Sequence, residues 1–141
     1  MAQGIAQGEG AAQCSAAQLA YLGDAVFELM VREMLLAQAG PEGAPLGYLN
    51  RRAKAYVSAP AQAAMYHKIY PRLNPAEQAV IKRGRNLHTT SRAKNAAATD
   101  YRHATGLEAL FGYLHQQGQG TRIRELFEWC VDISISPLLH T

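Results

Sequence analysis

Cysteine is scarce in this chain of 141 residues, which contains only Cys14 and Cys130. The two are far apart and neither belongs to a C-x-x-C pair. The sequence therefore lacks the ligand spacing of a zinc site and the cysteine density of a disulfide framework. It also lacks an apolar run of the roughly 18 residues that a membrane span needs. Residues 1–4 show neither the basic nor the apolar region of a signal peptide. These absences predict a cytoplasmic protein with no membrane contact.

Strand signals are missing as well. No segment combines a two-residue hydrophobic alternation with hairpin turns, and no internal repeat is visible. Hydrophobic residues make up 48% of the chain and charged residues 18%, which is typical of a globular protein of one domain. We therefore expect one all-α domain over residues 15–141. A flexible tail rich in Gly, Gln and Ala is expected over residues 1–14.

What the sequence does contain is a series of helix start and stop signals. Ser15 followed three residues later by Gln18 predicts a capping box, and Gly40 before a proline predicts a helix end. Asn74 begins another start signal, with proline next and glutamate third. The predicted helices cover about residues 16–39, 45–57, 58–70, 75–83, 95–118 and 122–133, with a polar, basic connection over 86–94.

Positive charge is concentrated in one segment. Residues 82–103, the basic segment, hold six Lys or Arg and one Asp, a net charge of +5. The other 8 basic and 10 acidic residues of the chain give −2. This distribution predicts a polyanionic partner for the basic segment.

Two carboxylates lie in the middle of apolar helical runs, Asp24 within residues 18–29 and Glu108 within residues 106–114. A charge there is costly unless something binds it, and Glu108 has no Lys or Arg within helical reach. Such a pair is typical of a Mg²⁺ site, where the ion can activate a water and stabilise charge on a phosphodiester. The alternative for Asp24 is a buried acid satisfied by backbone or arginine. For Glu28, one turn further on, we favour a structural role.

Glycines beside both acids weaken the interpretation of Asp24 as a buried acid satisfied by backbone or arginine. Glycine within a helix costs roughly 1 kcal/mol relative to alanine unless close packing or a ligand requires it. Gly23 precedes Asp24, and Gly106 and Gly112 bracket Glu108. We expect these glycines to let two helices approach until the carboxylates share one ion.

The run Arg83-Gly84-Arg85-Asn86 is typical of a phosphate-contacting turn, because arginine matches phosphate oxygens and glycine lets the backbone come close. A solvated surface remains the alternative for each of these side chains. The predicted phosphate-binding residues are Lys82, Arg83, Arg85, Asn86, His88, Arg92, Lys94 and Arg102.

Two of these motifs together resemble a known family. Residues 22–26 (Leu-Gly-Asp-Ala-Val) are similar to the signature helix of the ribonuclease III family, and residues 105–114 to its second acidic motif. With residues 17–33 and 83–86, the chain most resembles the short Mini-ribonuclease III branch. The four acids of larger members are reduced to Asp24 and Glu108, with Ala20 and Thr105 in the other positions, and the Mini branch shares this reduced set.

The resemblance implies the ribonuclease III endonuclease-domain fold, a helical homodimer holding double-stranded RNA in a valley across its interface. From the resemblance to the short branch we expect no separate RNA-binding domain, so the catalytic domain itself is expected to hold the RNA through the basic segment. The broad apolar surface of the first helix fits such a dimer. The predicted interface residues are Tyr21, Val26, Phe27 and Met30, and Met34 belongs to the same surface.

The implied activity is Mg²⁺-dependent hydrolysis of double-stranded RNA, with staggered cuts and 5′-phosphate and 3′-hydroxyl ends. Asp24 and Glu108 would be its catalytic residues and metal ligands. The implied substrate is precursor 23S (large-subunit) ribosomal RNA, with a large-subunit ribosomal protein as a further partner. The alternative is a non-catalytic helical dimer that binds structured RNA in a ribonucleoprotein, and a third hypothesis is a protein-interaction module. The RNA-binding scaffold does not account for two acids in apolar helices, and the interaction module would differ from both by binding that barely responds to salt.

Overall fold

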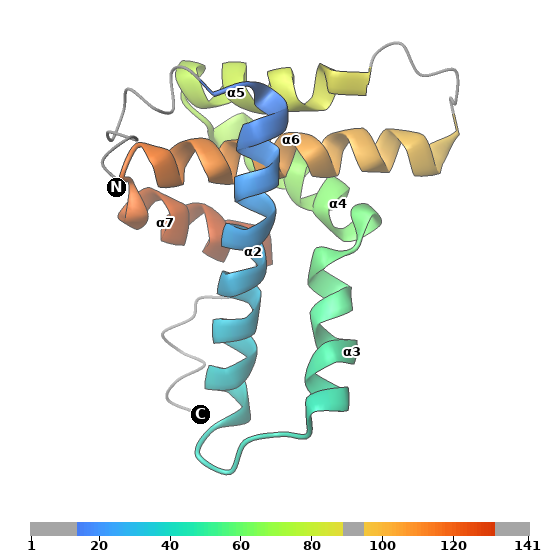
Figure 1. Ribbon diagram of the computed structural model, residues 1–141, viewed down its shortest axis with the longest axis vertical. Coiled ribbons are helices and arrows are strands. Elements are labelled where there is room, and N and C mark those ends of the chain that lie inside the picture. Colours follow the sequence, from blue (N-terminus) through green and yellow to red (C-terminus); the bar gives the residue numbers. More distant parts are fainter. Residues whose placement is uncertain (1–13, 89–94, 132–141) are drawn as a thin grey trace.

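All regular structure that the computed structural model describes, over residues 14–88 and 95–131, is helical. The prediction of an all-α fold is confirmed. The elements are α2 (Ala16–Ala39), α3 (Leu46–Val57), α4 (Ala59–Ile69), η2 (Tyr70–Arg72), α5 (Pro75–Arg85), η3 (Asn86–His88), α6 (Ala96–Gln116) and α7 (Gly120–Val131) (Figure 1). The tail at residues 1–13 and the predicted end of the last helix at residue 133 lie outside the described residues.

The helix ends confirm the capping signals. Ser15 N–H donates to Gln18 Oε1 at 3.0 Å and Gln18 N–H to Ser15 Oγ at 3.1 Å, which completes the capping box of α2. Asn74 and Glu77 form the same reciprocal pair at the start of α5. Gly40 ends α2 with φ of 73°, a conformation that glycine adopts without steric cost.

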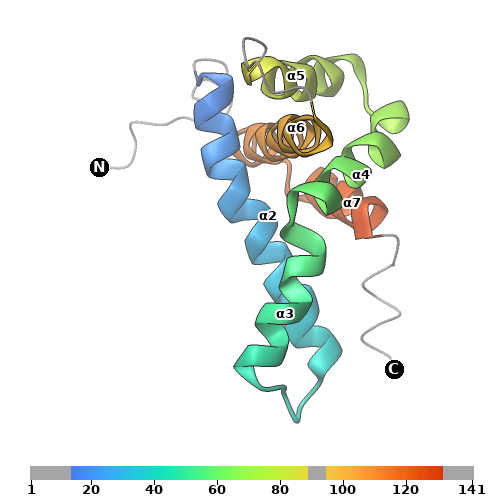
Figure 2. The same ribbon diagram turned by 90° about the vertical axis from the view of Figure 1, so that its right-hand side faces the viewer.

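Helix α6 is the centre of the fold. Figure 2 shows it nearly end-on, with α2, α5, α4 and α7 around it. Its residues from 104 to 114 are buried except Glu108 and Tyr113. Because neighbours cover it on several sides, α6 is the element that can carry a side chain to the meeting point of several helices.

Phe27 belongs to this core, which corrects the prediction that it lies at a dimer interface. It is 1% exposed, and its ring packs edge-on against Phe111 at 5.3 Å and Phe127 at 5.5 Å between centroids. Met34 is equally buried. The apolar face of α2 is wide because it meets α6 and α7 within the same chain, and hydrophobic periodicity does not tell an internal neighbour from a partner chain.

Two helix crossings depend on glycine. A Cβ added at Gly23 would overlap the carbonyl oxygen of Glu108, and one at Gly112 would overlap that of Leu19, so α2 and α6 are in backbone contact. On another side of α6, a Cβ at Gly106 would lie 2.6 Å from the Ile81 oxygen and one at Gly84 2.7 Å from the Ala109 Cβ. The expected close approach of the two helices is found at Gly23 and Gly112, whereas Gly106 serves the crossing with α5.

An ion pair joins α5 to α7. The Arg122 guanidinium donates to both carboxylate oxygens of Glu77 at 2.8 Å, and Asn74 N–H donates to Glu77 at 3.0 Å. Arg122 also pairs with Glu125 at 2.8 Å and lies 5.2 Å from the Trp129 ring centre. Glu77 is therefore a structural acid that links two helices.

The lower half of α2 extends past α6 and runs beside α3 (Figure 1). Helix α3 has no buried residue. In the described part of the chain, no helix has the combined length and apolar character needed to cross a membrane.

Candidate active site

The crossing of α2 and α6 brings the two predicted acids together. Gly23 touches the backbone of Glu108, so the next residue of α2, Asp24, emerges beside the Glu108 side chain. The two carboxyl groups are close enough to hydrogen-bond when one of them is protonated. The residues Ala17, Ala20, Tyr21, Asp24, Leu87, Tyr101, Thr105 and Glu108 line a shared cleft of about 330 Å³.

Exposure differs between the two acids. Asp24 is exposed, which corrects the expectation of a costly charge inside an apolar run, and Glu108 is half-buried. Helix α2 is covered by α6 on one side only, so Asp24 faces the open cleft although its neighbours in sequence are apolar. The free-energy cost of burying a charge, which was expected for both acids, therefore applies to Glu108 and not to Asp24.

The environment of Glu108 favours its protonated form. Burial, and then the charge of Asp24 and a hydrogen bond to it, raise the pKa of Glu108 from 4.5 to about 8. A hydrogen bond with Gln62 acts in the opposite direction. Among the described residues, neither Asp24 nor Glu108 forms an ion pair with Lys or Arg. A cation bound between them would relieve this repulsion.

Gln62 is a site residue that the sequence analysis missed. It lies on α4, is 3% exposed, and shares the buried face of that helix with Met65, Tyr66 and Ile69. A polar residue at the i position of an apolar i, i+3, i+4, i+7 series was the signal that could have identified it.

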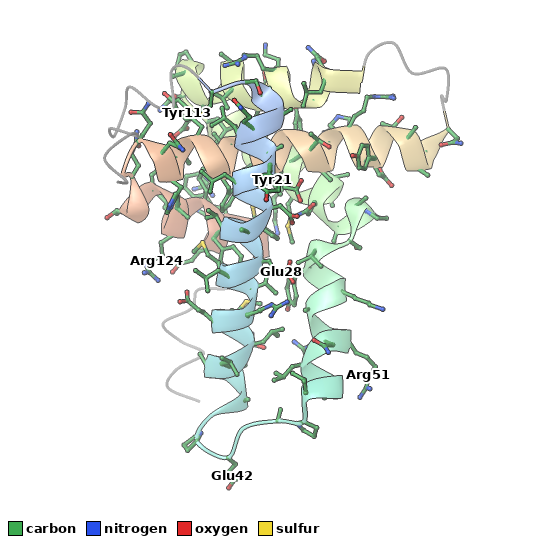
Figure 3. The ribbon with its side chains drawn as sticks, in the orientation of Figure 1. Tyr21, Glu28, Glu42, Arg51, Tyr113 and Arg124 are labelled. Atoms are coloured by element: carbon green, nitrogen blue, oxygen red, sulfur yellow. The ribbon has the colours of Figure 1, made fainter. Side chains whose placement is uncertain are left out.

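Ala20 and Thr105, which stand where larger ribonuclease III enzymes have two further acids, also line the cleft. Ala20 carries no polar group, and the Thr105 hydroxyl donates to the Tyr101 carbonyl oxygen of its own helix at 2.9 Å. Glu28 pairs with Arg32 at 2.6 Å, in agreement with its structural interpretation. Figure 3 shows Glu28 lower on α2 than Tyr21, which lies where α2 crosses α6.

Oxygen donors of this kind fit Mg²⁺. In the part of the chain that the structure describes, no three His, Cys, Asp or Glu residues gather as a metal-binding cluster. Asp24 and Glu108 are thus a two-carboxylate donor set. Mg²⁺ keeps several waters and is commonly held by one or two carboxylates plus substrate phosphates, so two acids can be enough where a substrate phosphate supplies further oxygens.

The described basic residues lie at the end of α5 and in the first half of α6. Lys82, Arg83 and Asn86 are exposed, and Arg102 is half-buried with a hydrogen bond to Thr99 at 3.3 Å. Arg85 is held by Tyr66 at 3.3 Å and by Asn86 at 3.1 Å. Arg92, Lys94 and the side chain of His88 lie outside the described residues.

The prediction that residues 83–86 form a turn is wrong. Residues 83–85 are the last residues of α5, and Gly84 is buried against α6 instead of approaching a ligand. The glycine serves helix packing, and the arginines on either side of it are presented from a helix end.

A cluster of aromatic rings beside the site was also missed. The His103 ring lies 4.6 Å from Tyr66 and 4.5 Å from His67 between centroids, and His103 Nδ1 is 2.8 Å from the Thr99 oxygen. These rings connect α4 to α6 one turn away from Gln62. Isolated histidines in sequence gave no sign of this contact.

The remaining interface candidates on α2 differ in exposure. Tyr21 is 86% exposed, whereas Val26 and Met30 are half-buried and pack partly against the core. The structure adds Leu29 and Leu36, each 57% exposed, to the apolar surface of α2.

Comparisons with known proteins identify the family of this chain. The family described as Ribonuclease III domain matches residues 17–119. A Mini-ribonuclease 3 of Enterococcus faecalis is 42% identical over 123 residues, which cover 84% of this chain and 89% of that protein. A Mini-ribonuclease 3 of Symbiobacterium thermophilum is 43% identical over 114 residues, which cover 81% and 85%. The crystal structure of a Fusobacterium nucleatum protein superposes with a TM-score of 0.72 at 30% identity and covers 85% of this chain and 93% of that one.

Proposed function

The chain belongs to the ribonuclease III family and is an endoribonuclease that acts on double-stranded RNA, and we propose that Mg²⁺ bound by Asp24 and Glu108 supports its catalysis. The observation that carries the proposal is the pairing of these two carboxylates in one cleft with no Lys or Arg partner among the described residues. In the Mini-ribonuclease III branch, two acids would thus perform what four do in larger members.

Each residue of the site has a distinct role in this proposal. Asp24, which faces the cleft, and Glu108 in its deprotonated form would together hold the ion. When bound, Mg²⁺ supplies the positive charge that lowers the pKa of an attacking water and offsets charge on the scissile phosphate. The products would carry 5′-phosphate and 3′-hydroxyl ends.

We propose that the basic segment holds the RNA backbone. Lys82, Arg83 and Asn86 are exposed at the end of α5, and Arg102 lies on α6. The proposal extends to Arg85 and to His88, Arg92 and Lys94. A-form duplexes are recognised mainly through phosphates and 2′-hydroxyls, so these contacts would position the duplex without specifying its sequence.

We further propose a homodimer formed through α2. Tyr21 lines the cleft and is exposed, Leu29 is exposed about two turns further along the helix, and Val26 and Met30 are partly accessible. Burial of such a stripe against its copy would remove apolar area from water. Two clefts in one dimer would cut the two strands with a stagger.

The proposed substrate is the duplex formed by the paired ends of precursor 23S ribosomal RNA, with a large-subunit ribosomal protein as a helper. Such a substrate would place the enzyme in the cytoplasm. The domain would comprise residues 15–141, with residues 1–14 as a tail.

Cleavage of an end-labelled RNA duplex tests the proposal, with Mg²⁺ and with excess chelator. Wild type and the control Glu28→Gln, which removes an acid of α2 outside the cleft, should both cut with Mg²⁺ and stop with chelator. Asp24→Asn and Glu108→Gln should each lose about 10²–10³-fold or more in rate, with folding and duplex binding preserved. An active Asp24→Asn protein would contradict the assignment, and binding without cutting in every lane would favour the non-catalytic scaffold.

A further inference from the structure

We infer that the outward face of α3, with Arg51 and Lys54, is a second contact surface for the phosphate backbone of the RNA duplex, outside both the cleft and the basic segment. The inference deepens the proposed function, because it rests on the proposal that the basic segment holds the same duplex. Arg51 and Lys54 would bind RNA and take no part in the chemistry at the two acids of the cleft.

The charge of the chain around α3 is the first argument. Residues 43–76 hold five Lys or Arg and no Asp or Glu, a net charge of +5 that equals the charge of the basic segment. Together these two stretches contain eleven of the fourteen Lys and Arg residues of the chain and one of its eleven acids. A stretch of this composition attracts a polyanion, and double-stranded RNA is the polyanion on which this enzyme acts.

The contacts of the individual cations are the second argument. The Arg72 guanidinium lies 3.7 Å from the ring centre of a tryptophan on α7, and Arg52 donates to Gln38 Oε1 on α2 at 3.4 Å. These two side chains hold helices together. Arg51 and Lys54, in contrast, are exposed and form no ion pair with an acid of the part of the chain that the structure describes. Their charges are therefore available to a ligand.

The packing of α3 is the third argument, because it fixes which side of the helix faces outward. The residues of α3 that pack against the core form one stripe along it, Leu49, Ala53, Tyr56 and Val57. With 3.6 residues per turn, Arg51 and Lys54 lie on the opposite face. Lys54 in the last turn also complements the helix dipole, but Arg51 in the middle of α3 has no such role.

The position of α3 is the fourth argument. In Figure 1, α5 ends and α6 begins on the side of α2 where α3 lies, and Figure 2 looks onto that side. The hydrogen bond of Arg52 to Gln38 places Arg51 beside a part of α2 that is roughly four turns, or about 20 Å, beyond Asp24. This separation is less than one turn of a duplex, which is about 34–36 Å in DNA. A duplex held at the cleft can therefore reach α3 with its flank.

Duplex binding at several salt concentrations tests the inference, with excess chelator so that the RNA is not cut. Arg51→Gln and Lys54→Gln each remove one charge, and we expect each to weaken binding about 3- to 10-fold at 0.1 M salt and to reduce the slope of log affinity against log salt by about 1. The matched control is Arg124→Gln, which should change neither. Arg124 is exposed on α7, and Figure 3 shows Arg51 and Arg124 on opposite sides of α2.

Three further readouts separate RNA contact from a general effect on the fold. Lys54→Arg keeps the charge and should restore the wild-type salt slope. In cleavage with Mg²⁺, Arg51→Gln and Lys54→Gln should raise KM while kcat at saturating RNA stays the same, because the lost contact lies away from the acids. The difference between wild type and these variants should also disappear for duplexes too short to reach from the cleft to α3.

A wild-type salt slope in both Arg51→Gln and Lys54→Gln would overturn the inference. A shift of the monomer–dimer equilibrium in these variants with unchanged duplex binding would also overturn it, since the face would then contact protein. Lys82→Gln separates this failure from that of the proposed function. If Lys82→Gln lowers the slope and the α3 variants do not, the inference alone fails; if wild type binds no duplex, the proposed function fails.

Discussion

Glu77 and Glu108 are both glutamates on helices that pack against each other, yet their surroundings are opposite. Burial alone would raise the pKa of Glu77, but hydrogen bonds from Arg122 and Asn74 and the charge of Arg122 lower it below 4.5. Glu108 faces another carboxylate, and burial together with Asp24 raises its pKa to about 8. Glu77 is neutralised by an arginine within the fold, whereas the nearest charged group to Glu108 that shifts its pKa is a second carboxylate.

The difference shows how an acid that builds the structure can be distinguished from one that serves chemistry. A buried charge is normally paired, and Glu77 follows this rule with donors from α5 and α7. Glu108 does not follow this rule, and it lies at a point where glycines allow two helix backbones to come into contact. Departures of this kind, held in place by a rigid core, are expected at functional sites.

Removal of the charge of Glu77 should have the largest effect on stability. Glu77→Gln breaks a buried pair, and we expect a loss of about 3 kcal/mol in the free energy of unfolding at pH 7, near the lower end for such pairs because Arg122 keeps Glu125. The pKa of Glu77 is lowered, so its stabilisation is present above pH 4.5 and is lost as the pH falls. Chemical denaturation at pH 7 and pH 3 measures both values. The Mg²⁺ dependence of cleavage should not change.

Adding a methyl group at the crossing of α2 and α6 should have the second-largest effect on stability. Gly23→Ala would push α2 away from the Glu108 backbone, and we expect a loss of about 2–3 kcal/mol with reduced cleavage, because the two acids separate. Gly47→Ala is the control: a Cβ there lies 3.6 Å from Arg51 Nη1, and alanine should stabilise α3 by about 0.5–1 kcal/mol. Figure 3 shows Arg51 projecting from α3 on the side away from α2. Equal stability of the two variants would argue against backbone contact at the crossing.

Neutralising Glu108 should stabilise the metal-free protein. Below pH 4.5 this acid is protonated in the folded and the unfolded chain, and between pH 4.5 and about 8 only the folded chain keeps the proton. Stability therefore falls as the pH rises through this window. Without metal, Glu108→Gln should exceed wild type by about 2 kcal/mol at pH 8 and match it at pH 4. Thermal unfolding at both pH values measures the difference, which saturating Mg²⁺ should reduce.

The smallest effect is expected for a single exposed cation of the basic segment. Lys82→Ala should weaken duplex binding a few-fold and reduce the slope of log affinity against log salt concentration by about 1. Arg124→Ala, an exposed residue that points outward from α7 in Figure 3, is the control and should change neither. A salt slope that is the same in both variants would remove Lys82 from the RNA contacts.

Local signals in the sequence identified the helices and their caps, because Ser15 with Gln18 and Asn74 with Glu77 interact within four residues. The meeting of Asp24 and Glu108 could also be predicted, since glycines beside both acids indicate a close crossing. Other features depend on long-range contacts. Phe27 could not be assigned to the core without Phe111 and Phe127, and the partner of Glu77 is 45 residues away.

The titration of glutamate side chains by ¹³C NMR, with and without Mg²⁺, tests the central contrast most directly. Without metal, Glu108 should titrate near pH 8 and Glu77 below 4.5. With Mg²⁺, the pKa of Glu108 should fall well below 7 while that of Glu77 stays in place, because only Glu108 gains a cation. A Glu108 that titrates near 4.5 and does not respond to Mg²⁺ would contradict the account.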